Sequence, residues 1–256
     1  MGGTMIRSLL QQELISAHQI VATCRHEASL ARLSDLDGLT TTLDNLTAVS
    51  GADVVLVCVK PQSVTALLDQ VSAALTPSQL VVSVVAGAAT PLLEKDLPHG
   101  APVVRAMPNT PSLIGAGMSA ICGGSSAGAE HIEIARSIFE SMGRVAVLDE
   151  SLFNAVTGLS ASGPAFIYIV IEALAEGGVK AGLPRAVATE LAAQTCLGAG
   201  RMVLETGSHP ALLKDDVTTP AGCTMDGILE LEEGGLRVTL IKAVVEATRR
   251  AGELVD

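Results

Sequence analysis

The stretch "DVVLVCVKPQSVTALLDQVSAALTPSQLVVSVVAG" (53–87) contains the alternation that decides the fold. Its ends, 53–59 and 80–87, are short, continuous, valine-rich runs, typical of strands buried on both faces of a sheet. The segment between them has helical periodicity and opens with Pro61, which a first helical turn tolerates. A strand, a helix and a second strand in this order predict two parallel strands joined by a crossover helix.

The same alternation extends over the first 150 residues. Weaker strand-like runs lie at 18–23, 101–106 and 143–149, and an amphipathic helical stretch lies at 127–142. Strands that alternate with helices predict an α/β fold with a Rossmann-like, doubly wound parallel sheet.

After residue 150 the strand-like runs stop and helical segments take over, at 162–182, 184–205 and 235–254. These helices are apolar on nearly every side, so other helices must cover them. The roughly 100 residues of this region are too few to cover all of these faces within one chain, which favours a dimer. We therefore expect two domains, a dinucleotide-binding domain at 1–150 and an all-helical dimerisation domain at 151–256.

Composition and charge exclude several functional classes. The 256 residues carry a net charge of −11, one tyrosine, three phenylalanines and no tryptophan, which argues against nucleic-acid binding. The longest uncharged stretch, 106–129, contains two prolines and several glycines, so we expect no membrane span. Five cysteines without a CxxC pair and five histidines without metal-like spacing predict no disulfide framework and no metal site. We expect no signal peptide and a cytoplasmic, reducing location.

Small or proline-rich turns follow three of the apolar runs: Lys60-Pro61, Ala86-Gly87 and "MPNTP" (107–111). In a doubly wound sheet, ligands bind beyond the carboxyl ends of the strands, so we expect these turns to form one site. Arg25 follows the run at 18–23, where an arginine accommodates the 2′-phosphate of NADP. A solvated surface arginine explains Arg25 equally well.

The segment 213–235 contains the loop Thr219–Thr224, which is rich in small residues and enters a helix at about Thr224. Backbone N–H groups and hydroxyls at such a helix start can bind an anion, for example a carboxylate. The alternative is that Thr224 simply caps the helix.

Five motifs, in this order and spacing, resemble the pyrroline-5-carboxylate reductase family from Gly3 to Leu254. They are "CVKPQ" (58–62), "MPNTP" (107–111), "GLSASGPAF" (158–166), "EGGVKAGLPR" (176–185) and "KDDVTTPAGCTMDGILELEEGGLR" (214–237). The resemblance implies reduction of the cyclic imine 1-pyrroline-5-carboxylate to L-proline, the last step of proline biosynthesis. It implies NADPH as the cofactor, with NADH as a weaker alternative, and a homodimer that can stack into a decamer.

The resemblance also implies the site residues. Thr224 would contact the imine nitrogen as the catalytic residue, and the substrate carboxylate would meet Thr219, Gly222, Cys223 and Thr224. The implied cofactor contacts are Gly3, Thr4, Met5, Arg25, Asn45, Val59, Lys60, Pro61, Ala86 and Gly87.

Two residues of the substrate loop depart from the family pattern. Ala221 replaces the first glycine of a Pro-Gly-Gly turn, which could stiffen the loop, and Cys223 replaces alanine or threonine. Two other functions stay open at this point. One is a related hydride-transfer enzyme acting on another imine or a β-hydroxy acid, and the other is an oligomer that has lost cofactor binding.

The glycine-rich opening "MGGTMIRSLL" (1–10) raises a separate expectation. The family's loop reads G-x-G-x-x-small, which places Met1 at the first glycine, Gly3 at the second and Ile6 at the small position. The strand that normally feeds this loop is therefore expected to be missing between the strands at 18–23 and 53–59. A truncated or misplaced start explains this, as does a shortened variant with weak NADPH affinity.

Overall fold

The computed structural model of the chain describes residues 1–253. The chain forms two compact units. The first consists of Met1–Ala161 and the residues from Ala247 onward, and the second consists of Ser162–Glu246. The predicted domain 151–256 and the resemblance up to Leu254 extend into residues 254–256, which lie outside the described residues.

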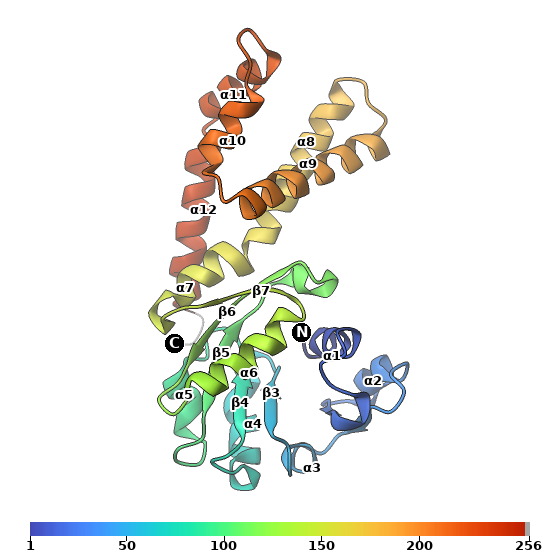
Figure 1. Cartoon of the computed structure of the whole chain (residues 1–256), viewed down its shortest axis with the longest axis vertical. Helices are drawn as coiled ribbons and strands as arrows, with labels where there is room; N and C mark the ends of the chain where they lie inside the picture. Colours follow the sequence, from blue (N-terminus) through green and yellow to red (C-terminus); the bar gives the residue numbers. More distant parts are fainter. Residues whose placement is uncertain (254–256) are drawn as a thin grey trace. The chain divides into compact units, whose positions relative to one another are not determined.

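A five-stranded sheet in the order β3-β4-β5-β6-β7 forms the centre of the first unit (Figure 1). The strands are β3 (Val54–Val57), β4 (Leu80–Ser83), β5 (Val103–Met107), β6 (Gly117–Gly123) and β7 (Gly143–Val147). The strands β3, β4 and β5 run parallel to one another. The predicted Rossmann-like α/β fold is confirmed.

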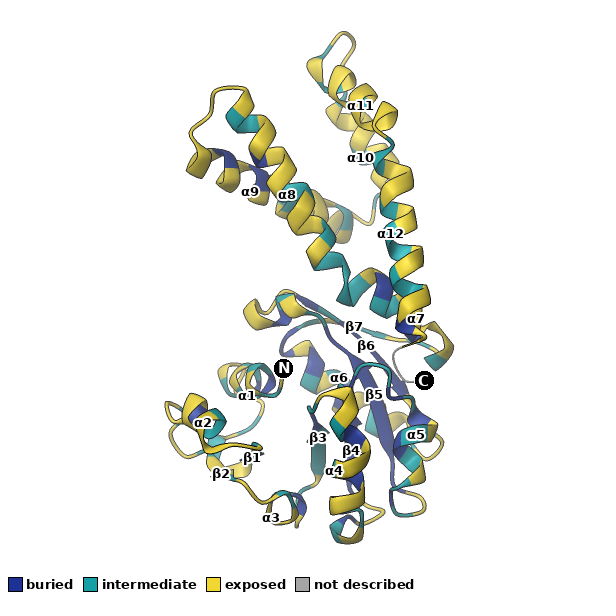
Figure 2. Ribbon diagram, turned by 180° about the vertical axis from the view of Figure 1, so that it is seen from behind, coloured by how far each residue is buried: buried dark blue, intermediate teal, exposed yellow. Residues whose placement is uncertain are grey.

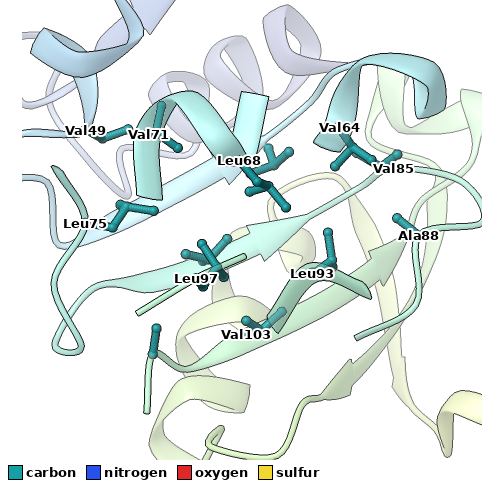
Figure 3. Close-up of a cluster of buried hydrophobic side chains, with 13 residues drawn as sticks. Val49, Val64, Leu68, Val71, Leu75, Val85, Ala88, Leu93, Leu97 and Val103 are labelled. Carbon is teal, nitrogen blue, oxygen red and sulfur yellow. The ribbon is translucent and has the colours of Figure 1, made fainter. Parts of the chain in front are cut away.

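Helices cover both faces of this sheet because its strands are apolar on both sides. On one face, α4 (Val64–Val71) and α5 (Thr90–Lys95) pack on Val81 and Val103 (Figure 3). On the other face, α1 (Gly2–Gln11) and α6 (Ala129–Glu140) pack on Val82 and Val104. Neighbouring strand residues thus enter different cores, as the continuous valine runs predict.

A second, two-stranded parallel sheet, β1 (Val21–Thr23) with β2 (Thr40–Thr42), lies apart from the larger one. The short helices α2 (Glu27–Leu30) and α3 (Asn45–Val49) belong to the same segment. Within residues 1–253 no strand joins β1 to β3, so β3 is an edge strand. Its first three residues are half-buried, whereas all of β4 is buried (Figure 2).

The structure corrects the predicted strands in three places. The strand expected at 18–23 begins only at Val21, because Ala17–Gln19 form a 3-10 turn in which the Gln19 side chain accepts from the Ser16 N–H. Neither β2 nor β6 was predicted. The sheet is also not wholly parallel: β6 is antiparallel to β5, because the connection between Met107 and Gly117 is too short for a crossover.

The segment Met1–Ala161 of the first unit ends with a 3-10 turn at Glu150–Leu152, α7 (Phe153–Val156) and a π-helical turn at Thr157–Ala161. The second unit contains α8 (Gly163–Lys180), α9 (Arg185–Thr206), α10 (Pro210–Val217), α11 (Cys223–Glu233) and most of α12 (Leu236–Ala251). No strand occurs between residues 151 and 253, as predicted, although α10 was not expected.

Apolar side chains of the second unit are mostly exposed in the single chain. Only Ala175, Ala188 and Ala192 form a buried cluster, where α8 and α9 pack together. Ile169 and Leu197 are among the large apolar residues left exposed on these two helices. The helical stretch Glu150–Lys180 is long and apolar enough to cross a membrane by length and composition, which is weak evidence for a span. A partner subunit would cover the same side chains.

Candidate active site

The carboxyl ends of β3, β4 and β5 lie at one edge of the sheet because the three strands are parallel. Val59, Lys60 and Pro61 follow β3, and the turn Ala86-Gly87 follows β4. Gly87 adopts φ +78°, a left-handed conformation that glycine adopts without steric cost. The structure thus brings these five predicted cofactor residues to a common edge.

The glycine-rich opening forms the first turn of α1, next to the end of β3. A Cβ atom on Gly2 would lie 3.3 Å from the Cβ of Cys58, so this close approach favours glycine. The first-turn amides of Gly3 and Thr4 have no partner within the helix, as at every helix start. Met5 differs, because its side chain is fully buried under the sheet and its N–H donates to the Met1 carbonyl. Gly3 and Thr4 therefore offer amides to an anion, and Met5 supports the turn from the core.

Two further predicted cofactor residues lie around the end of β1. Arg25 is exposed and has no ion-pair partner within residues 1–253. Asn45 begins α3, where its Oδ1 accepts a short hydrogen bond from Thr23 Oγ1 and its Nδ2 donates to Gln70 Oε1 at 2.9 Å. This chain of hydrogen bonds connects the end of β1 to α4 and fixes the direction of the Asn45 amide.

The predicted substrate residues lie in the second unit, in the turn before α11. The N–H of Gly222 donates to the Thr219 carbonyl at 2.9 Å, and Gly222 is the residue before the first helical turn. The alternative that Thr224 caps the helix is therefore wrong, because Thr224 is the second residue of α11. No side chain caps this helix, so the amides of Cys223 and Thr224 are free to bind an anion.

Backbone conformation explains one departure in this turn. Ala221 adopts φ +59°, which costs an L-residue about 1–2 kcal/mol and a glycine almost nothing. The glycine usual at this position in the family fits the same conformation without strain. Cys223, the other departure, is exposed at the helix start.

An ion pair between a buried arginine and a partly buried glutamate was not predicted from the sequence. Arg105 in β5 is only 4% exposed, and its Nη1 lies 3.0 Å from Glu150 Oε1. The same carboxylate accepts hydrogen bonds from the N–H and the hydroxyl of Thr90 at 2.7 and 2.6 Å. An arginine inside the apolar run "APVVRA" (101–106) was the signal that could have revealed it, because buried arginines need a partner.

Asn109 of the "MPNTP" motif forms a second contact that the sequence did not reveal. Its Nδ2 donates to the carbonyl of Ser160 at 3.2 Å, and its Oδ1 accepts from the N–H of Met118 at 2.9 Å. Two of the motifs that carry the family resemblance are thus hydrogen-bonded to each other within the first unit.

Neither Cys58, which is half-buried, nor Cys122, which is buried, is poised as a nucleophile. Burial raises the pKa of Cys58 to about 11 and that of Cys122 to about 12, so both thiols are protonated at neutral pH. Within residues 1–253 no three His, Cys, Asp or Glu side chains gather as a metal site. The described groups suit binding and orientation of a reactant.

The residues at the strand ends fit a dinucleotide phosphate. Arg25 and Lys60 are exposed cations, and the first turn of α1 adds N–H groups that favour negative charge. The turn Ala86-Gly87 carries no side chain larger than a methyl group.

Comparison with known proteins agrees with both halves of this description. A family model described as "Pyrroline-5-carboxylate reductase dimerisation" matches residues 150–254, and one described as "NADP oxidoreductase coenzyme F420-dependent" matches residues 1–87. A pyrroline-5-carboxylate reductase of Methanosarcina acetivorans is 41% identical over 99% of this chain and 94% of its own length. The chain belongs to the pyrroline-5-carboxylate reductase family.

Other members of the pyrroline-5-carboxylate reductase family agree over the whole chain. The enzyme of Synechocystis is 40% identical over 99% of this chain and 94% of its own length. A solved reductase structure from Coxiella burnetii superposes with a TM-score of 0.93 at 35% identity, covering 100% of this chain and 95% of that one. A Plasmodium falciparum pyrroline carboxylate reductase with NADP bound gives 0.88 at 25% identity, covering 100% and 94%.

Proposed function

We propose that this chain reduces 1-pyrroline-5-carboxylate to L-proline with NADPH, the last step of proline biosynthesis. The observation that carries the proposal is the turn Thr219–Thr224, whose two free amides and two hydroxyls suit a small carboxylate with a polar ring nitrogen. Family membership along the whole chain supports the same reaction.

The substrate half of the proposal rests on the start of α11. The carboxylate accepts hydrogen bonds from the amides of Cys223 and Thr224, and the Thr219 hydroxyl completes the contact. The N–H of Gly222 is not available to the substrate because it donates to the Thr219 carbonyl. Gly222 instead lets the substrate approach the backbone closely. Thr224 Oγ1 contacts the imine nitrogen and orients the ring. A protonated imine is a good hydride acceptor, so orientation and one polar contact suffice.

The cofactor half of the proposal rests on the sheet edge. NADPH supplies the hydride when it is bound. The amides of Gly3 and Thr4 bind phosphate, and Arg25 pairs with the 2′-phosphate. The buried side chain of Met5 supports the first turn of α1 from the core. The remaining contacts come from Asn45, Val59, Lys60, Pro61, Ala86 and Gly87. A charge-assisted contact at Arg25 favours NADPH over NADH.

The proposed assembly is a homodimer formed through the helices of the second unit, stacked into a decamer. Their exposed apolar side chains and the dimerisation family match support the dimer. The division into an NADP-binding domain at 1–150 and a substrate-binding domain at 151–256 belongs to the same proposal, as do a cytoplasmic location and the absence of nucleic-acid and membrane partners.

Steady-state kinetics of the full chain test this function. The protein is expected to oxidise NADPH with 1-pyrroline-5-carboxylate, and Thr224→Ala is expected to lower kcat about ten- to a thousandfold. Thr224→Ser keeps the hydroxyl and serves as the matched control. A preference for an open-chain hydroxy acid would contradict the substrate. Calorimetry without detectable NADPH binding would favour a non-catalytic oligomer, and an unchanged rate for Thr224→Ala would reduce that residue to part of the helix.

A further inference from the structure

The Arg105–Glu150 pair joins a buried guanidinium, whose side chain is 5% exposed, to a partly buried carboxylate, whose side chain is 26% exposed. Arg105 loses most of its hydration and Glu150 loses part of it, and apolar replacements of buried ion pairs are often neutral or stabilising. The guanidinium also lies over the Phe153 ring, 4.7 Å from its centroid, and its Nε has no hydrogen-bond partner in the described structure. Stability alone is therefore a weak explanation for this pair.

Both oxygens of the Glu150 carboxylate accept hydrogen bonds from specific neighbours. Oε1 accepts from the Thr90 N–H and from Arg105, and Oε2 accepts from the Thr90 hydroxyl. Burial would raise the pKa of Glu150, but the hydrogen bonds from Thr90 and Arg105 outweigh it, so the pKa lies below its ordinary value. The carboxylate is charged at neutral pH and binds both hydrogen-bond donors of Thr90, its N–H and its hydroxyl.

Thr90 begins α5 and follows the Ala86-Gly87 turn by three residues. One end of this turn is fixed by β4, and the other end is fixed by Glu150 through Thr90. Ala86 packs on the cluster that contains Phe153, the same ring on which Arg105 lies. The ion pair and the aromatic ring thus constrain the turn from two sides.

We propose that Glu150 is a positioning residue that sets the place of the Ala86-Gly87 turn, and through it the nicotinamide end of the cofactor. The inference rests on the proposed function, which assigns this turn to the cofactor, and it adds that the turn meets the nicotinamide end. Hydride transfer needs the donor and acceptor carbons in close, aligned contact, and a misplacement of about 1 Å can cost about 100-fold in rate. Glu150 acts on hydride transfer without touching either reactant.

The test is Glu150→Gln, which removes the charge and keeps the size of the side chain. We expect kcat to fall about tenfold or more, and the isotope effect with 4-deuterated NADPH to rise because hydride transfer becomes slower. By calorimetry, NADPH is expected to bind more weakly, whereas 2′,5′-ADP, which lacks the nicotinamide, keeps its affinity. The matched control is Glu133→Gln, which removes an exposed partner of Arg136 on α6.

A second pair of variants keeps the test valid if Glu150→Gln unfolds. Thr90→Val removes only the hydroxyl contact and leaves the Arg105–Glu150 pair intact, and Thr90→Ser restores the hydroxyl. We expect Thr90→Val to raise the isotope effect and Thr90→Ser to return it to the wild-type value.

Two results would overturn the inference: an unchanged isotope effect in both Glu150→Gln and Thr90→Val, or an equal loss of NADPH and 2′,5′-ADP affinity. A wild-type chain that does not reduce 1-pyrroline-5-carboxylate would instead refute the proposed function. In that case the calorimetric comparison of the two ligands still decides whether Glu150 positions the nicotinamide end.

Discussion

Replacement of Gly222 by alanine is expected to disable the turn before α11. A Cβ atom on Gly222 would lie 2.5 Å from Thr219 Oγ1 and 3.1 Å from the Thr219 carbonyl oxygen. Ordinary contact begins at 3.4 Å, so the Thr219 hydroxyl, which the proposed function places against the substrate carboxylate, has to move by almost 1 Å and the Thr219 carbonyl by a few tenths of an ångström. A displacement of this size can cost about 100-fold in rate, or about 2.7 kcal/mol of transition-state stabilisation. We expect kcat/KM for 1-pyrroline-5-carboxylate to fall by about that factor.

A double-mutant cycle isolates the cause. Thr219→Ala removes Oγ1, so Gly222→Ala is expected to cost much less in that background than in the wild type. Gly227→Ala is the matched control, because Gly227 lies in the same helix and a Cβ there meets nothing within 4 Å. Circular dichroism verifies that each variant is folded. Additive effects of the two substitutions, or a Gly222→Ala enzyme with wild-type kcat/KM, would refute the reasoning.

Three other predictions concern the cofactor, the assembly and pH. Arg25→Ala should raise KM for NADPH much more than KM for NADH; equal increases would remove Arg25 from 2′-phosphate recognition. Light scattering should find a dimer or larger assembly at micromolar concentration, and a folded monomer would contradict the helical interface. The pKa of Glu150 is lowered in the fold, so its carboxylate stabilises the fold at pH values above the ordinary glutamate pKa of 4.5, and this contribution is lost as the pH falls through the folded pKa. When the pH is lowered below about 5, the Tm of the Glu150→Gln variant should therefore fall less than the Tm of the wild type.

Much of the fold could be predicted from the sequence because periodicity is a local property. The valine runs at 53–59 and 80–87 mark strands buried on both faces, and the structure places their residues in two cores. The apolar helices after residue 150 likewise predict an all-helical region that needs a partner. Matching the opening residues to the glycine-loop pattern predicted that the strand before this loop is missing, and β1–β2 is accordingly separate from the larger sheet.

Contacts between distant residues could not be predicted in this way. The Arg105–Glu150 pair joins residues 45 positions apart, and the link between Asn109 and Ser160 spans 51 positions. Nothing local to either member specifies the partner; the packing of β5, α5 and the turn at Glu150–Leu152 brings Arg105 and Glu150 together.

The sequence by itself therefore determined the α/β class, the helical second region and the residue types of the substrate turn. Only the tertiary structure decided that β6 runs antiparallel, that Met5 is committed to the core, and that Thr224 lies inside the first turn of α11. The physical reason is that strand direction, burial and the exact helix start depend on free energies summed over neighbours far away in the chain. Hydrophobic periodicity reports only which face of each element turns inward.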